Sequence, residues 1–339
     1  MKMRTSIRLF WAIGVGLLAI LAVEAGTAQS PPPATKPSYR YFRVGNPSDK
    51  STQPLQGAAL MGGGTDQDPA FRWLCERARG GDFLILTATG DDDYNPYLQK
   101  LCKVNSVATL AIPDKAAAND PFVADTIRRA EAIFITGGDQ SNYIKYWQNT
   151  PVQTAINERL RQGVPIGGTS AGLAVLGEYI FTAMNDTAVS RETLADPYNK
   201  QVTLGTGFLD VPYMKGILTD QHFVKRDRLG RSVGFMARIL QDGMAPTVRE
   251  IAVDERNVVL VDEHGNATLV GKGAAYFMKP TQKPEVCQVG KPLTFRDINI
   301  YKIRSSGRFD LSSWTGEGGT SYSLSAVDGV LQSSSGSVY

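Results

Sequence analysis

Histidine and cysteine are scarce in this sequence. Only two histidines, His222 and His264, occur among 339 residues, and no H-x-x-x-H or C-x-x-C spacing is present. The sequence therefore lacks the nitrogen and sulfur ligands of a zinc site. The Gly62–Gly64 run lacks the Lys-Ser/Thr pair of a phosphate-binding loop, and acidic loops such as Asp91–Asp93 usually hold no cation. We expect a protein without a metal or an organic cofactor.

A large net charge and a repeated motif are also lacking. The formal charge of +3 is too small to indicate nucleic-acid binding, and no heptad array or short-period repeat is present. Hydrophobic residues make up 42% and charged residues 20% of the chain, which is typical of a globular protein. A length of 339 residues fits one or two domains.

The amino terminus has the pattern of a secretory signal peptide. Three basic residues precede an uncharged apolar run at 10–23, and its about 14 residues are fewer than the roughly 20 that span a bilayer. Small residues follow, with a cleavage site after Ala28 or after Ala25. We expect residues 1–28 to be removed and the mature chain to be secreted or periplasmic, without membrane contact. A retained membrane anchor is the alternative.

Export places the mature chain in an oxidising compartment, where cysteines can pair. The sequence has three cysteines, Cys75, Cys102 and Cys287. Cys75 and Cys102 form the simplest pair, which leaves one free thiol. Three buried free thiols are the alternative, because the sequence does not give the Cα separation on which a disulfide depends.

From residue 57 onward, apolar runs alternate with helical stretches. The runs lie at 58–61, 82–87, 107–112 and 132–135. Near-continuous apolar strands between helices predict an α/β fold, with a parallel sheet covered by helices on both faces. After residue 245 the strands become short, and His264-Gly265-Asn266 has the pattern of a hairpin turn. This change predicts antiparallel strands that pack on the same domain.

Composition changes at both ends of this region, residues 57–310. Residues 29–56 are rich in Pro, Ser and Thr, which predicts a linker or an edge extension. Residues 311–339 are rich in Ser and Gly, and only Tyr322–Leu331 has a strand pattern. We expect either a marginal edge strand or a disordered tail there.

The stretch Val164–Gly177 reads as an apolar strand, a Gly-rich turn and a helix of small residues. Ser170 lies within Gly168-Thr169-Ser170-Ala171-Gly172, the G-x-S-x-G pattern of a nucleophile elbow. The glycines relieve crowding at a turn that strains the serine backbone. Because Gly62–Gly64 and Gly137–Gln140 also follow apolar strands, we expect the three segments at one edge of the sheet, where ligands bind. A plain strand–helix turn is the alternative.

A serine nucleophile needs a base, and the two histidines limit the choice. His264 lies in the polar hairpin turn, where an exposed structural histidine is expected. His222 follows the apolar stretch Gly216–Leu218 at another strand end, so His222 is the candidate base. The sequence leaves open which acid orients it. The candidates are Asp242, Glu250, Asp254 and Glu255.

A basic segment follows His222. Lys225, Arg228 and Arg231 recur every three residues and would share one face of a helix. This face is either a solvated basic surface or a guanidinium cluster that binds a substrate carboxylate.

Four motifs, in this order along the chain, resemble those of the cyanophycinases, which are serine peptidases related to aspartyl dipeptidase. The motifs are Gly137-Gly138-Asp139-Gln140, Gly168-Thr169-Ser170-Ala171-Gly172, Asp220-Gln221-His222-Phe223 with Arg228 and Arg231, and Asp254-Glu255. The resemblance covers about residues 55–280, although segment 186–213 is longer than in the family. It implies a flavodoxin-like fold, akin to class I glutamine amidotransferase domains, and commonly a homodimer.

Carried over by position, the resemblance implies Ser170 as nucleophile, His222 as general base and Glu255 as the third member. Gly138 and Ala171 would supply the N–H groups of an oxyanion hole. The positions implied to contact substrate are Gln140, Asp220, Gln221, Arg226, Arg228 and Arg231. Arginines would then hold substrate carboxylates, and Asp220 would meet a substrate guanidinium.

The function implied by the resemblance is hydrolysis of cyanophycin, a poly-aspartate that carries arginine on each side-chain carboxyl, to β-Asp-Arg dipeptides. Two alternatives stay open. One is a peptidase of the same family that acts on isoaspartyl or Asp-X dipeptides. The other is a catalytically silent module that binds acidic or arginine-rich ligands.

Overall fold

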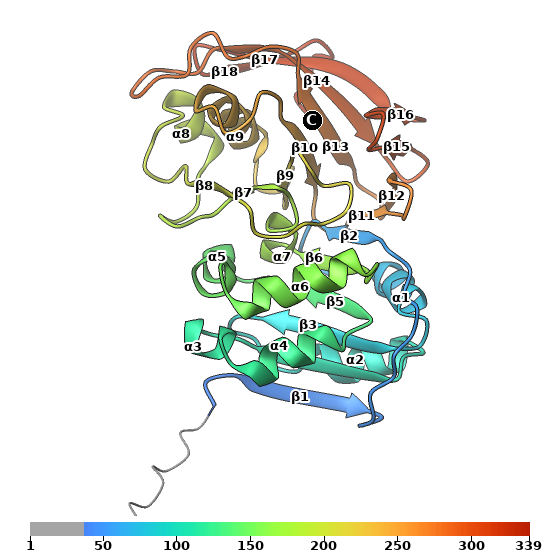
Figure 1. The fold of residues 1–339 in the computed structure, drawn as a ribbon. Coiled ribbons are helices and arrows are strands. Elements are labelled where there is room, and N and C mark those ends of the chain that lie inside the picture. The colour runs from blue at the N-terminus through green and yellow to red at the C-terminus, as the bar shows by residue number, and fades with distance from the viewer. Residues whose placement is uncertain (1–36) are drawn as a thin grey trace, which may run out of the picture. The chain divides into compact units, whose positions relative to one another are not determined.

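A ten-stranded sheet contains the parallel strands that the sequence predicts (Figure 1). The computed structural model describes residues 37–339, so the predicted signal peptide lies outside the described residues. Strands β4, β3, β5, β6 and β2 are neighbours and run parallel. In sheet order the strands are β1 (Arg40–Gly45), β4 (Ser106–Ala111), β3 (Asp82–Thr87), β5 (Ala132–Ile135), β6 (Ile166–Thr169), β2 (Ala58–Met61), β11 (Val258–Val261), β12 (Asn266–Val270), β15 (Arg308–Asp310) and β16 (Thr315–Glu317).

Helices cover both faces of this parallel part, because alternate strand residues point to opposite sides. On one face Leu84 and Leu86 of β3 pack in a core shared with α3 to α6, and on the other Phe83 and Ile85 pack with α1 and α2. These helices are α1 (Asp68–Arg77), α2 (Tyr94–Leu101), α3 (Lys115–Ala118), α4 (Pro121–Arg128), α5 (Gln140–Trp147) and α6 (Pro151–Arg161).

A second, eight-stranded sheet was not foreseen. In order, its strands are β18 (Val330–Ser333), β17 (Thr320–Val327), β14 (Phe295–Ile303), β13 (Ala275–Pro280), β10 (Arg249–Val253), β9 (Ile217–Asp220), β7 (Tyr179–Phe181) and β8 (Leu204–Thr206). Strands β7, β9 and β10 are parallel, and the others pair antiparallel. Helices α8 (Ser190–Ala195) and α9 (Leu229–Gln241) pack on it, and the short α7 (Ala171–Ala174) follows β6.

The predicted antiparallel strands therefore divide between two sheets instead of forming one added layer. Strands β11, β12, β15 and β16 extend the first sheet beyond β2, whereas β13, β14, β17 and β18 extend the second. Both sheets nevertheless belong to one compact unit, Pro37–Tyr339. The sequence pattern gave strand positions but not their partners, because pairing depends on residues far apart in the chain.

Both flanking segments are part of this unit. Strand β1 lies within the predicted linker 29–56 and pairs antiparallel with β4, so its described part is an edge extension. In the Ser/Gly-rich tail, β17 pairs with β14, and β18 pairs with β17. The alternative of a disordered tail is therefore wrong, and the boundaries expected at residues 57 and 310 fall inside the unit.

Candidate active site

Ser170 occupies a sharp turn between β6 and α7. Its backbone has φ 52° and ψ −115°, a conformation that costs energy in a non-glycine residue. A Cβ atom on Gly168 would lie 2.5 Å from the Gly172 backbone, and one on Gly172 would lie 2.1 Å from the Ile135 oxygen. Two glycines are therefore required sterically, and the sequence pattern identified this local geometry.

Three side chains form one hydrogen-bonded chain that starts at this turn. The Ser170 Oγ lies 2.8 Å from Nε2 of His222. The Nδ1 of His222 lies 2.7 Å from Oε1 of Glu255. His222 follows β9 in the second sheet, and Glu255 lies in the turn between β10 and β11. The structure thus brings together three residues that sequence reasoning placed in one triad.

The charge state of this chain suits proton transfer from the serine. The hydrogen bond from His222 lowers the pKa of Glu255, which is therefore a carboxylate and accepts from Nδ1–H. Burial lowers the pKa of His222 below its ordinary 6.5; nearby Arg226 and Arg228 act in the same direction, and Glu255 opposes them. A neutral His222 with its hydrogen on Nδ1 leaves Nε2 free to accept the proton of Ser170.

The Gly62–Gly64 segment packs directly against His222. The backbone N–H of His222 donates to the Gly62 oxygen at 2.8 Å, and Gly63 has φ +89°. A Cβ atom on Gly63 would lie 2.4 Å from the imidazole ring. Sequence reasoning placed this segment at the site but did not predict its role. The glycine has no side chain, so the imidazole of His222 can pack directly against the backbone.

Two backbone N–H groups lie beside Ser170 on different segments. Ala171 begins α7, and Gly138 follows β5 with φ +133°. Within residues 37–339, neither N–H is engaged in a hydrogen bond with another group of the protein. Both amides thus remain free to donate to a ligand that contacts Ser170.

A pocket of about 310 Å³ opens next to Ser170 and contains charges of both signs. Its lining includes Gly138, Asp139, Gln140, Ser141, Lys145, Ser170, Phe181, Asp186, Thr187, Gln221, Arg226, Arg228 and Arg231. Most of the predicted substrate positions are therefore gathered here. Gln140 is held in place by its Nε2, which donates to the Phe181 oxygen at 2.8 Å.

Asp220 is the exception among the predicted substrate positions, because it is buried and is not among the residues that line the pocket. Nε of Arg231 donates to its Oδ2 at 2.8 Å, and Nη2 of Arg231 donates to its Oδ1. Although burial raises the pKa of Asp220, the charges of Arg231 and Arg228 outweigh it and hold that pKa below 3.8. The expectation that Asp220 meets a substrate guanidinium is therefore wrong, since Arg231 of the same chain fills that place.

The basic segment is not a helix face. Helix α9 begins only at Leu229, and residues 223–227 form a turn in which Asp227 has φ 48°. Arg231 is 2% exposed and also donates to the Ala188 oxygen at 3.3 Å, so it anchors the long 186–213 segment. Arg226, at 53% exposure, is the guanidinium most open to a ligand. The alternative of a solvated basic surface is thus wrong for Arg231, which instead lies among the residues that line the pocket.

Comparisons with known proteins match part of this chain to a peptidase family and to named cyanophycinases. Residues 67–199, which include Gly138 and Ser170, match the family described as Peptidase family S51. A cyanophycinase of Trichormus variabilis is 27% identical over 211 residues, which cover 60% of this chain and 65% of that protein's length. A cyanophycinase of Synechococcus elongatus is 25% identical over 287 residues, covering 78% of this chain and 84% of that protein.

This match, which covers less than half of the chain, and the cyanophycinase relatives together support a serine-type peptidase similar to family S51. The family match ends before His222 and Glu255, so their inclusion in the site rests on geometry and on the resemblance of the motifs. The crystal structure of a peptidase from an acI-B1 Actinobacterium aligns with a TM-score of 0.50 at 15% identity, covering 76% of this chain and 98% of that one. This likeness concerns the fold alone and confirms the predicted flavodoxin-like α/β architecture.

The other acids considered for the triad lie elsewhere in the structure. Asp254 accepts hydrogen bonds from the N–H groups of Val224 and Lys225, at 3.1 and 3.0 Å. Asp242 pairs with Arg238 at the end of α9. Glu250 is fully buried in the second sheet, and neither of its carboxyl oxygens has a hydrogen-bond partner. Burial and the neighbouring Asp220 raise the pKa of Glu250 well above 4.5, so this carboxyl is neutral.

Sequence reasoning missed Asp66, which supports the Ser170 turn. Its Oδ1 accepts from the Thr169 hydroxyl at 2.9 Å, and its Oδ2 accepts from the Tyr94 hydroxyl at 2.5 Å. Tyr94 begins α2, so Asp66 links that helix to the residue before Ser170. No sequence motif indicates these contacts, because Tyr94 and Thr169 lie 28 and 103 positions after Asp66 in the sequence.

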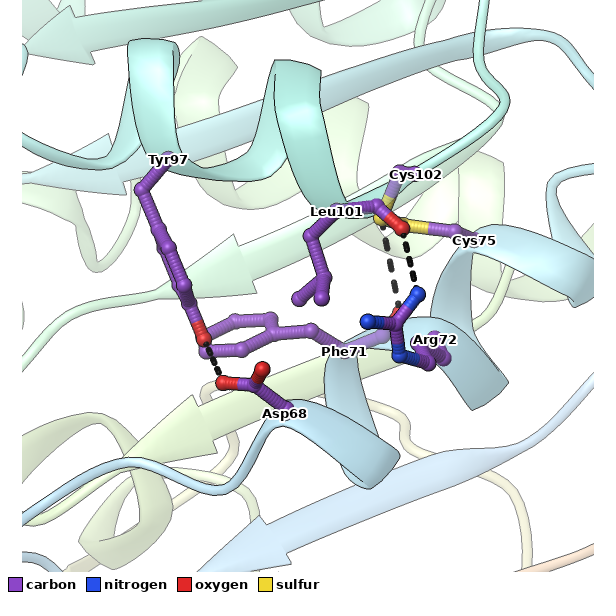
Figure 2. The surroundings of a disulfide bond; sticks show 7 residues. All are labelled: Asp68, Phe71, Arg72, Cys75, Tyr97, Leu101 and Cys102. Atoms are coloured by element: carbon purple, nitrogen blue, oxygen red, sulfur yellow. Dashed lines mark hydrogen bonds between the residues drawn. A yellow bond between two sulfur atoms is a disulfide. The ribbon is translucent and has the colours of Figure 1, made fainter.

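A disulfide joins α1 to the residue that follows α2 (Figure 2). Cys75 and Cys102 are bonded, with 5.8 Å between their Cα atoms, and Cys287 is buried and unpaired. The hydroxyl of Tyr97 donates to Asp68 at 2.5 Å across the same two helices. The alternative of three free thiols is thus excluded.

Residues 37–339 contain no group of three His, Cys, Asp or Glu side chains suited to hold a metal ion. Nor does any helix in this range have the length and apolar character needed to cross a membrane.

Proposed function

We propose that the chain is an exported serine peptidase that hydrolyses cyanophycin to β-Asp-Arg dipeptides through Ser170, His222 and Glu255. The observation that carries this proposal is the unbroken hydrogen-bonded chain from Ser170 through His222 to Glu255. It ends at a serine in a strained elbow, which is the geometry that serine hydrolases use on many folds.

In the proposed reaction, Ser170 Oγ attacks the scissile carbonyl carbon while His222 Nε2 takes its proton. The carbonyl oxygen becomes an oxyanion that accepts hydrogen bonds from the N–H groups of Gly138 and Ala171. The carboxylate of Glu255 stabilises the imidazolium. His222 then protonates the leaving amine, and an acyl–serine remains. Water attacks this ester with His222 as base, the product acid leaves, and Ser170 regains its proton.

The pocket supports a substrate that carries charges of both signs. Arg226 and Lys145 offer cations to carboxylates, whereas Asp139 and Asp186 offer carboxylates to guanidiniums. Cyanophycin carries both groups in every repeat, and the relatives reported above are named cyanophycinases. Because Asp220 is already paired with Arg231, a substrate guanidinium would meet the acids that line the pocket.

Export is proposed from the amino-terminal pattern, and the Cys75–Cys102 disulfide fits an oxidising compartment. A homodimer stays a prediction from the family resemblance.

The test is incubation of the purified mature chain with insoluble cyanophycin, followed by mass spectrometry of the soluble products. We expect wild type to release β-Asp-Arg, Ser170→Ala and His222→Ala to release none above background, and His264→Ala to match wild type. His264 is a suitable control because it is 75% exposed in a hairpin turn.

Two other outcomes would contradict the proposal in different ways. Cleavage of isoaspartyl dipeptides without release from the polymer would favour a dipeptidase of the same family. Binding of an arginine-rich or acidic ligand without turnover, and without labelling of Ser170 by an organophosphonate, would favour a silent module.

A further inference from the structure

The turn that connects β9 to α9, residues 221–228, carries two functional parts. His222 stands near its beginning, and Arg226 and Arg228 stand near its end and line the pocket. The beginning is well anchored, because the His222 N–H bonds Gly62 and the Asp254 carboxylate accepts from two N–H groups of the turn. Both His222 and Asp227 have φ 48°, so the turn is strained at its two ends, and at the second end Ser190 Oγ donates to the backbone oxygen of Asp227.

Tyr339, 112 positions from Asp227 in the sequence, adds a second side-chain support at this end. Its hydroxyl donates to Oδ1 of Asp227 at 2.8 Å and accepts from the N–H of Leu229 at 3.1 Å. Leu229 begins α9, where a backbone N–H has no partner inside the helix. One phenol thus satisfies both a carboxylate and an N–H group at the end of the turn, and the chain end lies next to α9 (Figure 1).

The ring of Tyr339 adds a packing contact on the same turn. It lies edge to face with Phe223 at 5.8 Å and with Tyr276 at 6.2 Å between ring centroids. Phe223 directly follows His222 and is fully buried. Tyr339 therefore contacts the turn at its beginning through the ring and at its end through the hydroxyl.

We propose that Tyr339 is a positioning residue that holds the 221–228 turn so that Arg226 and Arg228 face the substrate pocket. Loss of its hydroxyl leaves the Leu229 N–H and the Asp227 carboxylate without this partner, and the strained end of the turn relaxes. His222 keeps its own bonds to Glu255 and Gly62, so substrate binding weakens more than the chemical step does. The kinetic part of this inference rests on the proposed function.

Tyr339→Phe is the decisive variant, because it removes one oxygen and keeps the ring. We expect its KM for a charged cyanophycin-derived peptide to rise about three- to tenfold, as for loss of one or two hydrogen bonds, while kcat stays within about twofold. Asp227→Asn keeps an acceptor oxygen but replaces the carboxylate by a neutral amide, so it should raise KM less than Tyr339→Phe does, and the two changes together should be less than additive. The matched control is Tyr301→Phe, whose hydroxyl accepts from the Gly319 N–H at 3.0 Å away from the turn.

Amide hydrogen exchange supplies a readout that needs no substrate. Exchange at residues 223–229 should be faster in Tyr339→Phe than in wild type and Tyr301→Phe. Unchanged exchange in a folded Tyr339→Phe variant would overturn the inference, as would equal KM changes in both tyrosine variants. If wild type cleaves no cyanophycin peptide, the proposed function fails while the exchange result still decides the role of Tyr339.

Discussion

The two sides of the candidate site are built in different ways. On the Ser170 side, the turn between β6 and α7 is fixed by close backbone contacts of Gly168 and Gly172 with their immediate surroundings. On the His222 side, the turn after β9 is irregular and depends on side chains from distant segments, including Glu255, Asp254 and Tyr339. The first side is held by steric fit and the second by charge and hydrogen bonding.

This difference determines how each side responds to change. The glycine contacts of the Ser170 turn should respond little to pH or salt, and the charged group described beside them is the Asp66 carboxylate, which accepts from Thr169 and Tyr94. Around His222, by contrast, Asp220, Arg228 and Arg231 form a buried ionic cluster, and removal of one partner leaves another charge without compensation. The His222 side should therefore be the more vulnerable one to single substitutions.

The largest effect should come from Glu255→Gln, which changes the His222 side of the site and leaves the Ser170 turn as it is. An amide in place of the carboxylate can favour the wrong tautomer of His222 and cannot stabilise the imidazolium. We expect kcat to fall about 10³- to 10⁴-fold with the fold intact, measured with a cyanophycin peptide and by circular dichroism. Glu263→Gln, in the turn before His264, should retain wild-type activity. A tenfold loss or less in Glu255→Gln would contradict a role of Glu255 in the triad.

Asp220→Asn should break the ionic cluster itself. Arg231 would then keep its buried charge without the carboxylate, and we expect the free energy of unfolding to fall by about 3–5 kcal/mol in urea titrations. Asp242→Asn removes the partially exposed partner of Arg238 and should cost at most about 1 kcal/mol. If the free energy of unfolding fell equally in the two variants, burial of the Asp220–Arg231 pair would not increase the cost of removing one partner.

Removal of the disulfide tests the Ser170 side. The Cys75→Ser/Cys102→Ser double variant frees a cross-link that spans 27 positions, and we expect the free energy of unfolding to fall by about 3 kcal/mol. Turnover by the remaining folded protein should stay within about threefold of wild type, because Ser170 keeps its glycine contacts. Cys287→Ser, which breaks no cross-link, is the control. If kcat fell much more than threefold in the folded double variant, the glycine contacts alone would not be enough to hold the Ser170 turn.

The smallest effect concerns the pH dependence. Activity needs neutral His222, so kcat/KM should fall as the pH drops through its lowered pKa. The charge of Arg226 contributes to that lowering, so Arg226→Gln should raise the pKa of His222 and move the acidic limb of the pH profile to higher pH. Arg161→Gln, an exposed change distant from the pocket residues, should leave the limb in place. If the acidic limb moved to lower pH in Arg226→Gln, the charge of Arg226 would not lower the pKa of His222, and this explanation would be wrong.

The sequence predicted best what depends on neighbouring residues. The alternation of apolar runs and helices predicted the α/β architecture, and the glycines around Ser170 predicted its turn. His222 followed from the scarcity of histidine. The choice of Glu255 over Asp254 needed the family resemblance, because adjacent acids in one turn differ only in which side chain faces the imidazole.

The remaining features depend on burial and on contacts between distant residues, which a single sequence does not contain. The family resemblance implied that Asp220 and Arg231 contact substrate, yet in the structure they form a buried ion pair with each other. The composition of the tail left a marginal edge strand and a disordered end both open, yet β17 and β18 complete the second sheet, and Tyr322, Leu324 and Ala326 are buried in a core that includes residues of α9. The roles assigned to the triad and to the pocket residues stay predictions until the variants are measured.

The order of the site residues along the chain has a consequence for biosynthesis. His222 follows Ser170 by 52 positions, and Glu255 follows His222 by another 33. The ribosome therefore completes the nucleophile long before it has made the base or the acid. A partly synthesised or unfolded chain has a serine without its base and its acid, so the proposed triad forms only when the polypeptide has folded.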